Sequence, residues 1–146
     1  MGKPMIYIRD GSSREYLMEM LAQKVCAAPL IEISRVQCCE FSNARFKYNG
    51  DEYKQGLYAI YDRNQNLQYV GMVGDGEGTS IYARMNDHIK HDKWIDVDGC
   101  FRFCKFENLN DEQLRIAERL VILWMRPAWN DGGTSQAQID RWTWVL

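Results

Sequence analysis

Apolar positions that repeat with helical spacing predict three helices. They cover about residues 13–27, 79–91 and 111–126. Ser12 and Glu15 form a capping-box pattern at the start of the first helix. Asn110 caps the third helix, which ends before Pro127. The third helix is apolar around most of its girth, which is typical of a central element of the core.

Short runs rich in β-branched and aromatic residues predict strands. They cover about residues 5–8, 57–61, 67–71 and 101–106. The second and third runs flank a polar turn, which predicts a hairpin. An even loop, Asp62 to Gln65, would place Tyr58 opposite Tyr69 on one face, whereas an odd loop would separate them onto opposite faces. We expect the even loop, and residues 30–50 leave room for one or two more strands.

Each strand of this hairpin carries a tyrosine and a glycine within one three-residue run. The two runs are Gly56-Leu57-Tyr58 and Tyr69-Val70-Gly71. Core packing explains either tyrosine alone, and the glycines suit a backbone that bends or lets another group approach closely. The stretch Gly74–Gly78 lacks the Lys-Ser/Thr of a phosphate-binding loop and contains two acidic residues, so we interpret it as a connector.

The chain length predicts one domain with a modest core, since there are 146 residues. We expect residues 1–50 to form an N-terminal extension of strand and helix, either a distinct unit or part of the same domain, and residues 51–146 to form the main domain. The longest unbroken apolar run, Leu120 to Met125, is far shorter than the roughly 20 residues of a membrane span. The N-terminus lacks the apolar core of a signal peptide, so we expect a cytoplasmic protein.

The odd number of cysteines favours reduced thiols. The five are Cys26, Cys38, Cys39, Cys100 and Cys104. The pair Cys38-Cys39 and the pair Cys100 and Cys104 could together supply four thiolates to a structural zinc, but their spacing matches no known zinc motif. We therefore expect buried apolar thiols and keep a cysteine-based metal or redox protein as a minor alternative.

The charge of the chain is unusual for a protein that holds DNA. The formal net charge is −2 and the pI is about 5.7. A protein that neutralises many phosphates is usually basic, so nucleic-acid binding here would need a local patch or a partner. Residues 1–50 carry seven basic and five acidic side chains, which places the mild basic excess in this part of the chain.

Two helices carry polar side chains in unexpected positions. Arg84 and His88 lie one turn apart, beside the apolar stripe of the second helix. Glu118 lies among apolar neighbours on the third helix, where a carboxylate is costly unless it is paired or binds a metal. Asn130 follows soon after Pro127. Taken singly, Arg84 and His88 suit a solvated helix edge, Glu118 suits a salt bridge, and Asn130 suits a turn.

Together, the two tyrosine runs and the four polar residues resemble the GIY-YIG nuclease superfamily. The resemblance covers about residues 55–131 and rests on the order and spacing of Tyr58, Tyr69, Arg84, His88, Glu118 and Asn130. A single three-residue run is weak, but the whole constellation is specific. The chain departs from many members after the second run, where Met72 and Val73 replace a polar residue or lysine.

The resemblance implies an α+β fold with a small, three-stranded, mostly antiparallel sheet flanked by helices. It also implies roles for the six residues. Glu118 would bind one Mg²⁺ or Mn²⁺ ion, Tyr58 would act as general base, and Arg84 would stabilise the phosphate. Tyr69 and His88 would orient or assist, and Asn130 would support its neighbours.

The function implied by the resemblance is metal-dependent hydrolysis of DNA phosphodiester bonds. A non-catalytic nucleic-acid-binding or assembly module on a nuclease fold remains the alternative. The short chain favours a compact restriction-like or phage-like enzyme over a modular one. One site cuts one strand at a time, so cutting both strands would require a homodimer or sequential nicking, and residues 1–50 are the natural place for a dimer contact.

Overall fold

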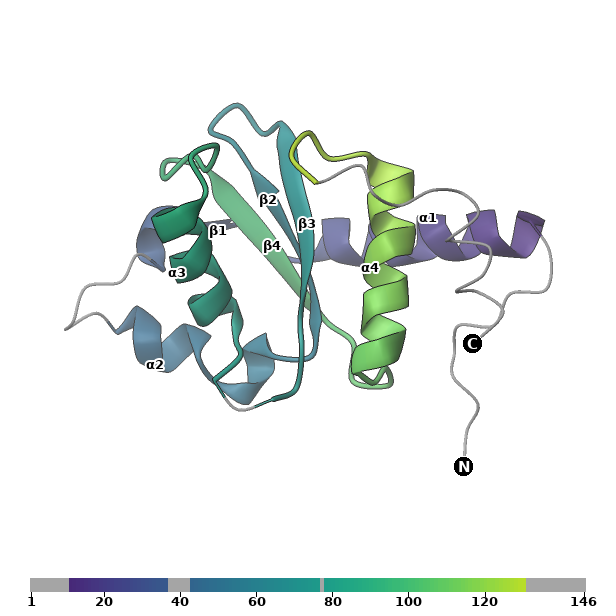
Figure 1. Cartoon of the computed structure of the whole chain (residues 1–146), viewed down its shortest axis with the longest axis horizontal. Helices are drawn as coiled ribbons and strands as arrows, with labels where there is room; N and C mark the ends of the chain where they lie inside the picture. Colours follow the sequence, from purple (N-terminus) through teal and green to yellow (C-terminus); the bar gives the residue numbers. More distant parts are fainter. Residues whose placement is uncertain (1–10, 37–42, 77, 131–146) are drawn as a thin grey trace.

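A computed structural model of the chain describes residues 11–36, 43–76 and 78–130 (Figure 1). The predicted strand at residues 5–8 lies outside the described residues, as do Cys38 and Cys39. The helices are α1 (Gly11–Ala27), α2 (Ala44–Tyr48), α3 (Ile81–His91) and α4 (Asp111–Met125), with short 3-10 turns at Ile33–Arg35 and Asp51–Tyr53. The strands are β1 (Ile31–Glu32), β2 (Gly56–Tyr61), β3 (Leu67–Val73) and β4 (Cys100–Lys105).

The strands form one antiparallel sheet in the order β1-β4-β2-β3. The α+β class with an antiparallel sheet and helices is confirmed, but the described part of the sheet has four strands rather than three. The extra strand, β1, pairs only two residues with β4. Residues 30–50 thus supply one strand, within the one or two expected there, and the other described segments of this range are 3-10 or turn residues and α2.

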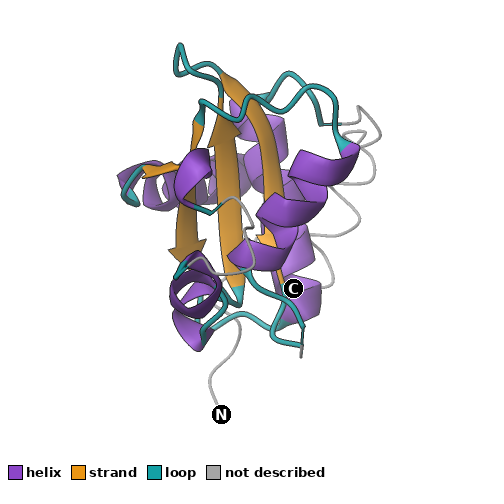
Figure 2. Cartoon of the chain, turned by 90° about the vertical axis from the view of Figure 1, so that its left-hand side faces the viewer, coloured by secondary structure: helices purple, strands orange, loops and turns teal. Residues whose placement is uncertain are grey.

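Helices cover both faces of the sheet (Figures 1 and 2). On one face, α1 and α4 pack on Leu57, Ala59 and Val70 and enclose the first apolar core. On the other face, α2 and α3 pack on Tyr58, Ile60 and neighbouring side chains and enclose the second. No helix in the described part of the chain is long and apolar enough to cross a membrane.

Side-chain caps fix where the two later helices begin. The Ser80 hydroxyl accepts a hydrogen bond from the Ala83 N–H at the start of α3. Asn110 and Gln113 form a reciprocal capping box at the start of α4, which confirms the predicted cap. The predicted helix 13–27 is also confirmed, although α1 already begins at Gly11, before Ser12.

The hairpin register differs from the predicted one. Tyr61 pairs with Leu67, so the loop between them has an odd number of residues. The register then shifts by one residue, so that Ile60 pairs with Tyr69 and Tyr58 pairs with Gly71. The extra residue is Gln68, and this bulge reverses the effect of the odd loop. Tyr58 and Tyr69 therefore share a face as diagonal neighbours, and their ring centroids lie 6.0 Å apart. The prediction that they are directly opposite is wrong.

The register explains why both runs contain glycine. A Cβ added at Gly71 would lie 2.4 Å from the Tyr58 hydroxyl oxygen, since the ring lies across this residue. A Cβ at Gly56 would lie 2.1 Å from the Cys104 carbonyl oxygen. The expectation that these glycines permit a close approach is confirmed.

Gly71→Ala is expected to destabilise the protein by about 1–3 kcal/mol, because the added methyl group must displace the Tyr58 ring in a packed core. Urea denaturation measures the change in the free energy of unfolding. Gly50→Ala is the matched control, since a Cβ there meets nothing within 4 Å. Equal stability of the two variants would contradict the packing of Tyr58 on Gly71.

Candidate active site

A hydrogen bond joins β2 to α3 at the centre of the candidate site. The Tyr58 hydroxyl lies 2.8 Å from His88 Nε2, and both side chains are buried. His88 Nδ1 lies 2.5 Å from Asp92 Oδ2, at the end of α3. Asp92 is a hydrogen-bond acceptor when ionised, so Nδ1 carries the proton of a neutral His88 and Nε2 accepts from Tyr58.

The pKa of His88 lies below its ordinary value of 6.5. Burial is the main cause, and the nearby charge of Arg84 acts in the same direction. The hydrogen bond and the charge of Asp92 oppose the shift. His88 is therefore neutral at neutral pH and able to receive a proton at Nε2.

The pKa of Tyr58 lies well above 10, its ordinary value. Burial dominates, the interaction with Tyr69 adds to it, and Arg84 acts against it. We expected Arg84 together with a metal to favour the phenolate. The charge of Arg84 does favour the phenolate, but in the protein without metal the effect of burial on the pKa is larger. Tyr58 is therefore a neutral phenol that needs a partner to lose its proton.

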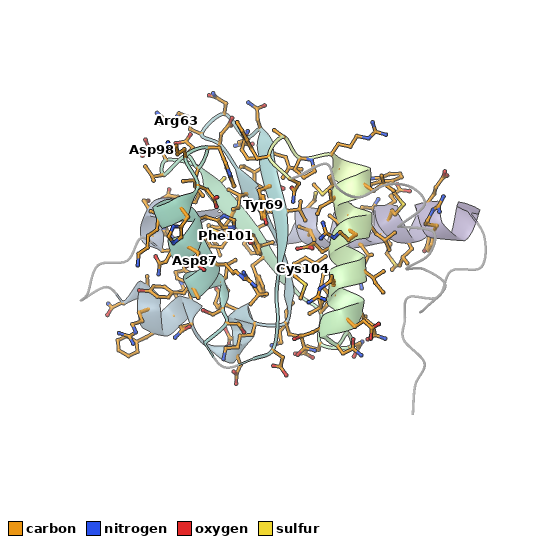
Figure 3. All side chains as sticks on the ribbon, viewed as in Figure 1. Arg63, Tyr69, Asp87, Asp98, Phe101 and Cys104 are labelled. Atoms are coloured by element: carbon orange, nitrogen blue, oxygen red, sulfur yellow. The ribbon has the colours of Figure 1, made fainter. Side chains whose placement is uncertain are left out.

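Tyr69, on β3, lies on the sheet face toward α3 (Figure 3). Its ring contacts that of His88. The Tyr69 and His88 ring centroids are 4.8 Å apart in an edge-to-face arrangement. Burial raises the pKa of Tyr69 as well. The ring of Trp94 stacks on that of Tyr69, with centroids 5.5 Å apart.

Glu118 approaches the same edge of the sheet from α4. Its side chain is 14% exposed, and its oxygen lies 3.9 Å from Arg119 Nε, which is a long ion pair. Burial raises the pKa of Glu118 above its ordinary value, whereas Arg119, Arg84 and a main-chain hydrogen bond from Met72 lower it. The result is a poorly solvated carboxylate near the guanidinium of Arg84.

Arg84 is exposed on α3, one turn before His88. Its charge lowers the pKa of Tyr58, Tyr69 and Glu118, so it lies within electrostatic range of all three. An exposed guanidinium at this position can bind an oxyanion from solution in a bidentate manner.

Asn130 contacts the main chain of β3 rather than the other site residues. Its Oδ1 accepts from the Val70 N–H at 2.8 Å, and its Nδ2 donates to the Val70 carbonyl at 2.7 Å. The Trp129 N–H also donates to the Gln68 carbonyl at 2.7 Å. The segment after α4 is therefore fixed along the outer edge of β3, from Leu67 to Val70.

The structure thus brings Tyr58, Tyr69 and His88 into direct contact and places Arg84 and Glu118 in electrostatic range of them. No family model, curated protein or solved structure matches this chain significantly. The assignment of a function therefore depends on the chemistry of these residues.

The cysteines do not form a metal site in the described chain. Within it, no group of three His, Cys, Asp or Glu residues is arranged to hold an ion. Cys26 is exposed, whereas Cys100 and Cys104 are partly buried free thiols. The expectation of buried apolar thiols is thus wrong for Cys26. Cys104 lies on the sheet face toward α4, away from Tyr69 (Figure 3).

Sequence reasoning missed Asp92, Trp94 and Trp129. Asp92 follows His88 at i+4, the spacing at which two side chains meet on one helix face, so this contact could have been found. The stacking of Trp94 on Trp129 joins segments far apart in the chain, and no local pattern indicates it.

Proposed function

We propose that this protein is a metal-dependent endonuclease that hydrolyses DNA phosphodiester bonds, and that it is a member of the GIY-YIG superfamily. The observation that carries the proposal is the hydrogen-bonded series from Asp92 through His88 to Tyr58, beside Arg84 and Glu118. A proton acceptor, an exposed cation and a desolvated carboxylate that can hold a metal are groups that together catalyse phosphodiester hydrolysis.

The geometry supports a two-proton path. Tyr58 gives its proton to His88 Nε2 and takes one from the attacking water. The imidazolium that forms is stabilised by Asp92, whose hydrogen bond and charge favour it. The water oxygen then bonds to phosphorus, the bond to the leaving oxygen breaks, and a solvent water protonates that oxygen. The imidazolium of His88 returns its proton to the resulting hydroxide, so the protons balance over one turnover. Arg84 stabilises the charge that develops on the phosphoryl oxygens.

Glu118 fits the coordination of one divalent ion. Mg²⁺ is commonly bound through one or two carboxylates, with waters and substrate phosphates completing its octahedral shell. Glu118 is mostly buried, and its ion pair with Arg119 is long. The charge of the carboxylate is therefore only weakly compensated by this contact. When bound, Mg²⁺ or Mn²⁺ would polarise the phosphate and stabilise the leaving oxygen.

The acidic net charge is compatible with this proposal because the segment 84–93 exposes four basic side chains and only one acidic one, Asp87. Arg84, Lys90, His91 and Lys93 are exposed on α3 and the turn that follows it. A phosphate backbone that follows this segment could contact the other basic side chains as well as Arg84. The proposal places the protein in the cytoplasm, where its described free thiols would stay reduced.

A supercoiled plasmid incubated with the wild-type protein tests this function. We expect nicked or linear product with Mg²⁺ or Mn²⁺ and none with EDTA. Mostly nicked product would indicate a single site acting on one strand, whereas directly formed linear product would support a homodimer. The plasmid could remain intact at high protein concentration with either metal, and short duplexes and single strands of varied sequence could remain intact as well. Both results together would favour a non-catalytic binding module.

Asp92→Asn is expected to reduce cleavage about 10- to 100-fold, because an amide no longer holds the Nδ1 proton or stabilises the imidazolium. It also removes groups that raise the pKa of His88. In the wild type, cleavage should fall at acidic pH, once His88 is protonated below 6.5, its ordinary pKa. In the variant this acidic limb should move to lower pH.

The measurement is the cleavage rate as a function of pH for both proteins. Asp87→Asn is the control, since Asp87 is an exposed carboxylate on the same helix. A profile of Asp92→Asn identical to that of Asp87→Asn would show that Asp92 does not act through His88.

A further inference from the structure

We propose that Trp94 and Trp129 form a stacking platform for an unpaired nucleobase next to the scissile phosphate, so that the preferred DNA is single-stranded, branched or mismatched. This inference rests on the proposed nuclease function and names the substrate class of the same site.

The platform is the outer part of a row of rings that begins in the site. Trp94 stacks on Tyr69, with centroids 5.5 Å apart and planes 23° apart. Trp129 stacks on Trp94, with centroids 6.2 Å apart and planes only 8° apart. Because Tyr69 also contacts His88, the row leads directly from the proposed catalytic group to the surface.

Trp129 is presented to solvent on a fixed backbone. It is 52% exposed, although it packs on Trp94. Its N–H is bonded to the Gln68 carbonyl, and Asn130 is bonded twice to Val70. A large aromatic side chain that is held rigidly and remains half exposed gains little from folding, but it is preorganised to bind a flat ligand.

The surrounding charge favours a nucleotide over an apolar ligand. Arg84 is exposed on α3 one turn before His88, whose ring centroid lies 5.6 Å from that of Trp94, and the exposed Lys93 directly precedes Trp94 in the chain. Basic side chains beside aromatic faces are the arrangement that binds single-stranded nucleic acid, the cations meeting the backbone and the rings meeting the bases.

The arrangement selects unpaired bases for a physical reason. In an intact duplex both faces of each base are already stacked on neighbouring bases, so a protein ring can reach a base face only where the strand is open or the base is turned out. Stacking of this kind tolerates every base, because each has a π-face. The preference should therefore be for DNA structure rather than sequence.

Binding is measured by fluorescence anisotropy in EDTA, which keeps the result independent of cleavage. The probes are a labelled oligothymidylate of about 15 nucleotides and a blunt hairpin duplex carrying the same label. Trp129→Ala is expected to weaken oligothymidylate binding about tenfold and to leave duplex binding unchanged. The variant keeps its main-chain bond to Gln68, and its melting temperature verifies that it is folded.

Trp124→Ala is the matched control, because Trp124 is 43% exposed on α4 and belongs to none of the ring pairs found in the described chain. It should bind both probes like the wild type. Unchanged oligothymidylate binding by Trp129→Ala, or equal losses on both probes, would overturn the inference. Oligouridylate bound much more tightly than oligothymidylate would overturn the assignment to DNA.

Cleavage assays separate this inference from the nuclease proposal. If the wild type cuts paired DNA as fast as single strands and Trp129→Ala does the same, the platform is wrong and the nuclease stands. If oligothymidylate binds through Trp129 but no DNA is cut with Mg²⁺ or Mn²⁺, the platform stands and the nuclease is wrong.

Discussion

Glu118→Gln should lower the rate of metal-dependent DNA cleavage by a factor of about 10³ or more. Metal ions supply several kcal/mol of transition-state stabilisation, and each tenfold in rate corresponds to about 1.36 kcal/mol. The neutral amide has nearly the shape of the carboxylate but is a much weaker ligand for Mg²⁺. Plasmid cleavage at saturating metal, together with calorimetric titration of Mn²⁺, measures the two effects.

The same substitution should not destabilise the metal-free protein. Burial raises the pKa of Glu118 in the folded state, so the folded state favours the protonated form. Ionisation of Glu118 therefore opposes folding, and this effect builds as the pH rises above 4.5, its ordinary pKa. At neutral pH Glu118→Gln removes the effect, so its melting temperature should equal or exceed that of the wild type.

Glu112→Gln is the control, since Glu112 is an exposed carboxylate in the first turn of the same helix. It should retain wild-type cleavage. A Glu118→Gln variant that cuts DNA at the wild-type rate would remove Glu118 from the site, whereas a lower melting temperature would show that the carboxylate is structural. Loss of activity with unchanged or increased stability is the signature of a functional residue.

Tyr58→Phe should lower the cleavage rate by about 10²–10⁴, the usual contribution of a positioned general base. The ring still packs on Gly71, but the hydroxyl that bonds His88 Nε2 is gone. Losing one buried hydrogen bond should reduce stability by only about 1 kcal/mol. Single-turnover cleavage and urea denaturation provide the two measurements.

Tyr48→Phe is the control, because Tyr48 is also a buried tyrosine of the second apolar core. Tyr69→Phe is the decisive companion, since Tyr58 is only 2% exposed whereas Tyr69 is partly exposed. If Tyr69→Phe loses much more activity than Tyr58→Phe, water is activated at Tyr69 and the roles of the two tyrosines are exchanged.

Local patterns were sufficient to predict the helices α1, α3 and α4 and the strands β2, β3 and β4, but not the short helix α2. Helix α4, for example, begins at the predicted cap Asn110 because cap and helix are adjacent in the chain. A strand was allowed within residues 30–50, but the bounds of β1 could not be identified, because it pairs only two residues and depends on β4.

The hairpin register could not be predicted because its determinants lie elsewhere in the chain. The carbonyl of the bulged residue Gln68 accepts from the Trp129 N–H, and its side-chain amide donates to Asp62. The first of these partners comes from the segment after α4. The loop residues alone therefore contain too little information to show that a bulge compensates for the odd loop.

The identity of the site residues was predicted more completely than their burial and pKa values. The spacing of Tyr58, Tyr69, Arg84, His88, Glu118 and Asn130 indicated a common site, but it contained no information on burial. Burial determines the pKa of Tyr58, and it makes His88 and Asp92 necessary to the proposed proton path.

Parallel cleavage of one supercoiled plasmid by the wild type, Tyr58→Phe and Glu118→Gln, with Mg²⁺ and at low salt, tests the central claim most directly. We predict nicked or linear product from the wild type and almost none from the two variants, with all three proteins folded by circular dichroism. Equal cleavage by all three proteins would contradict the proposed active site.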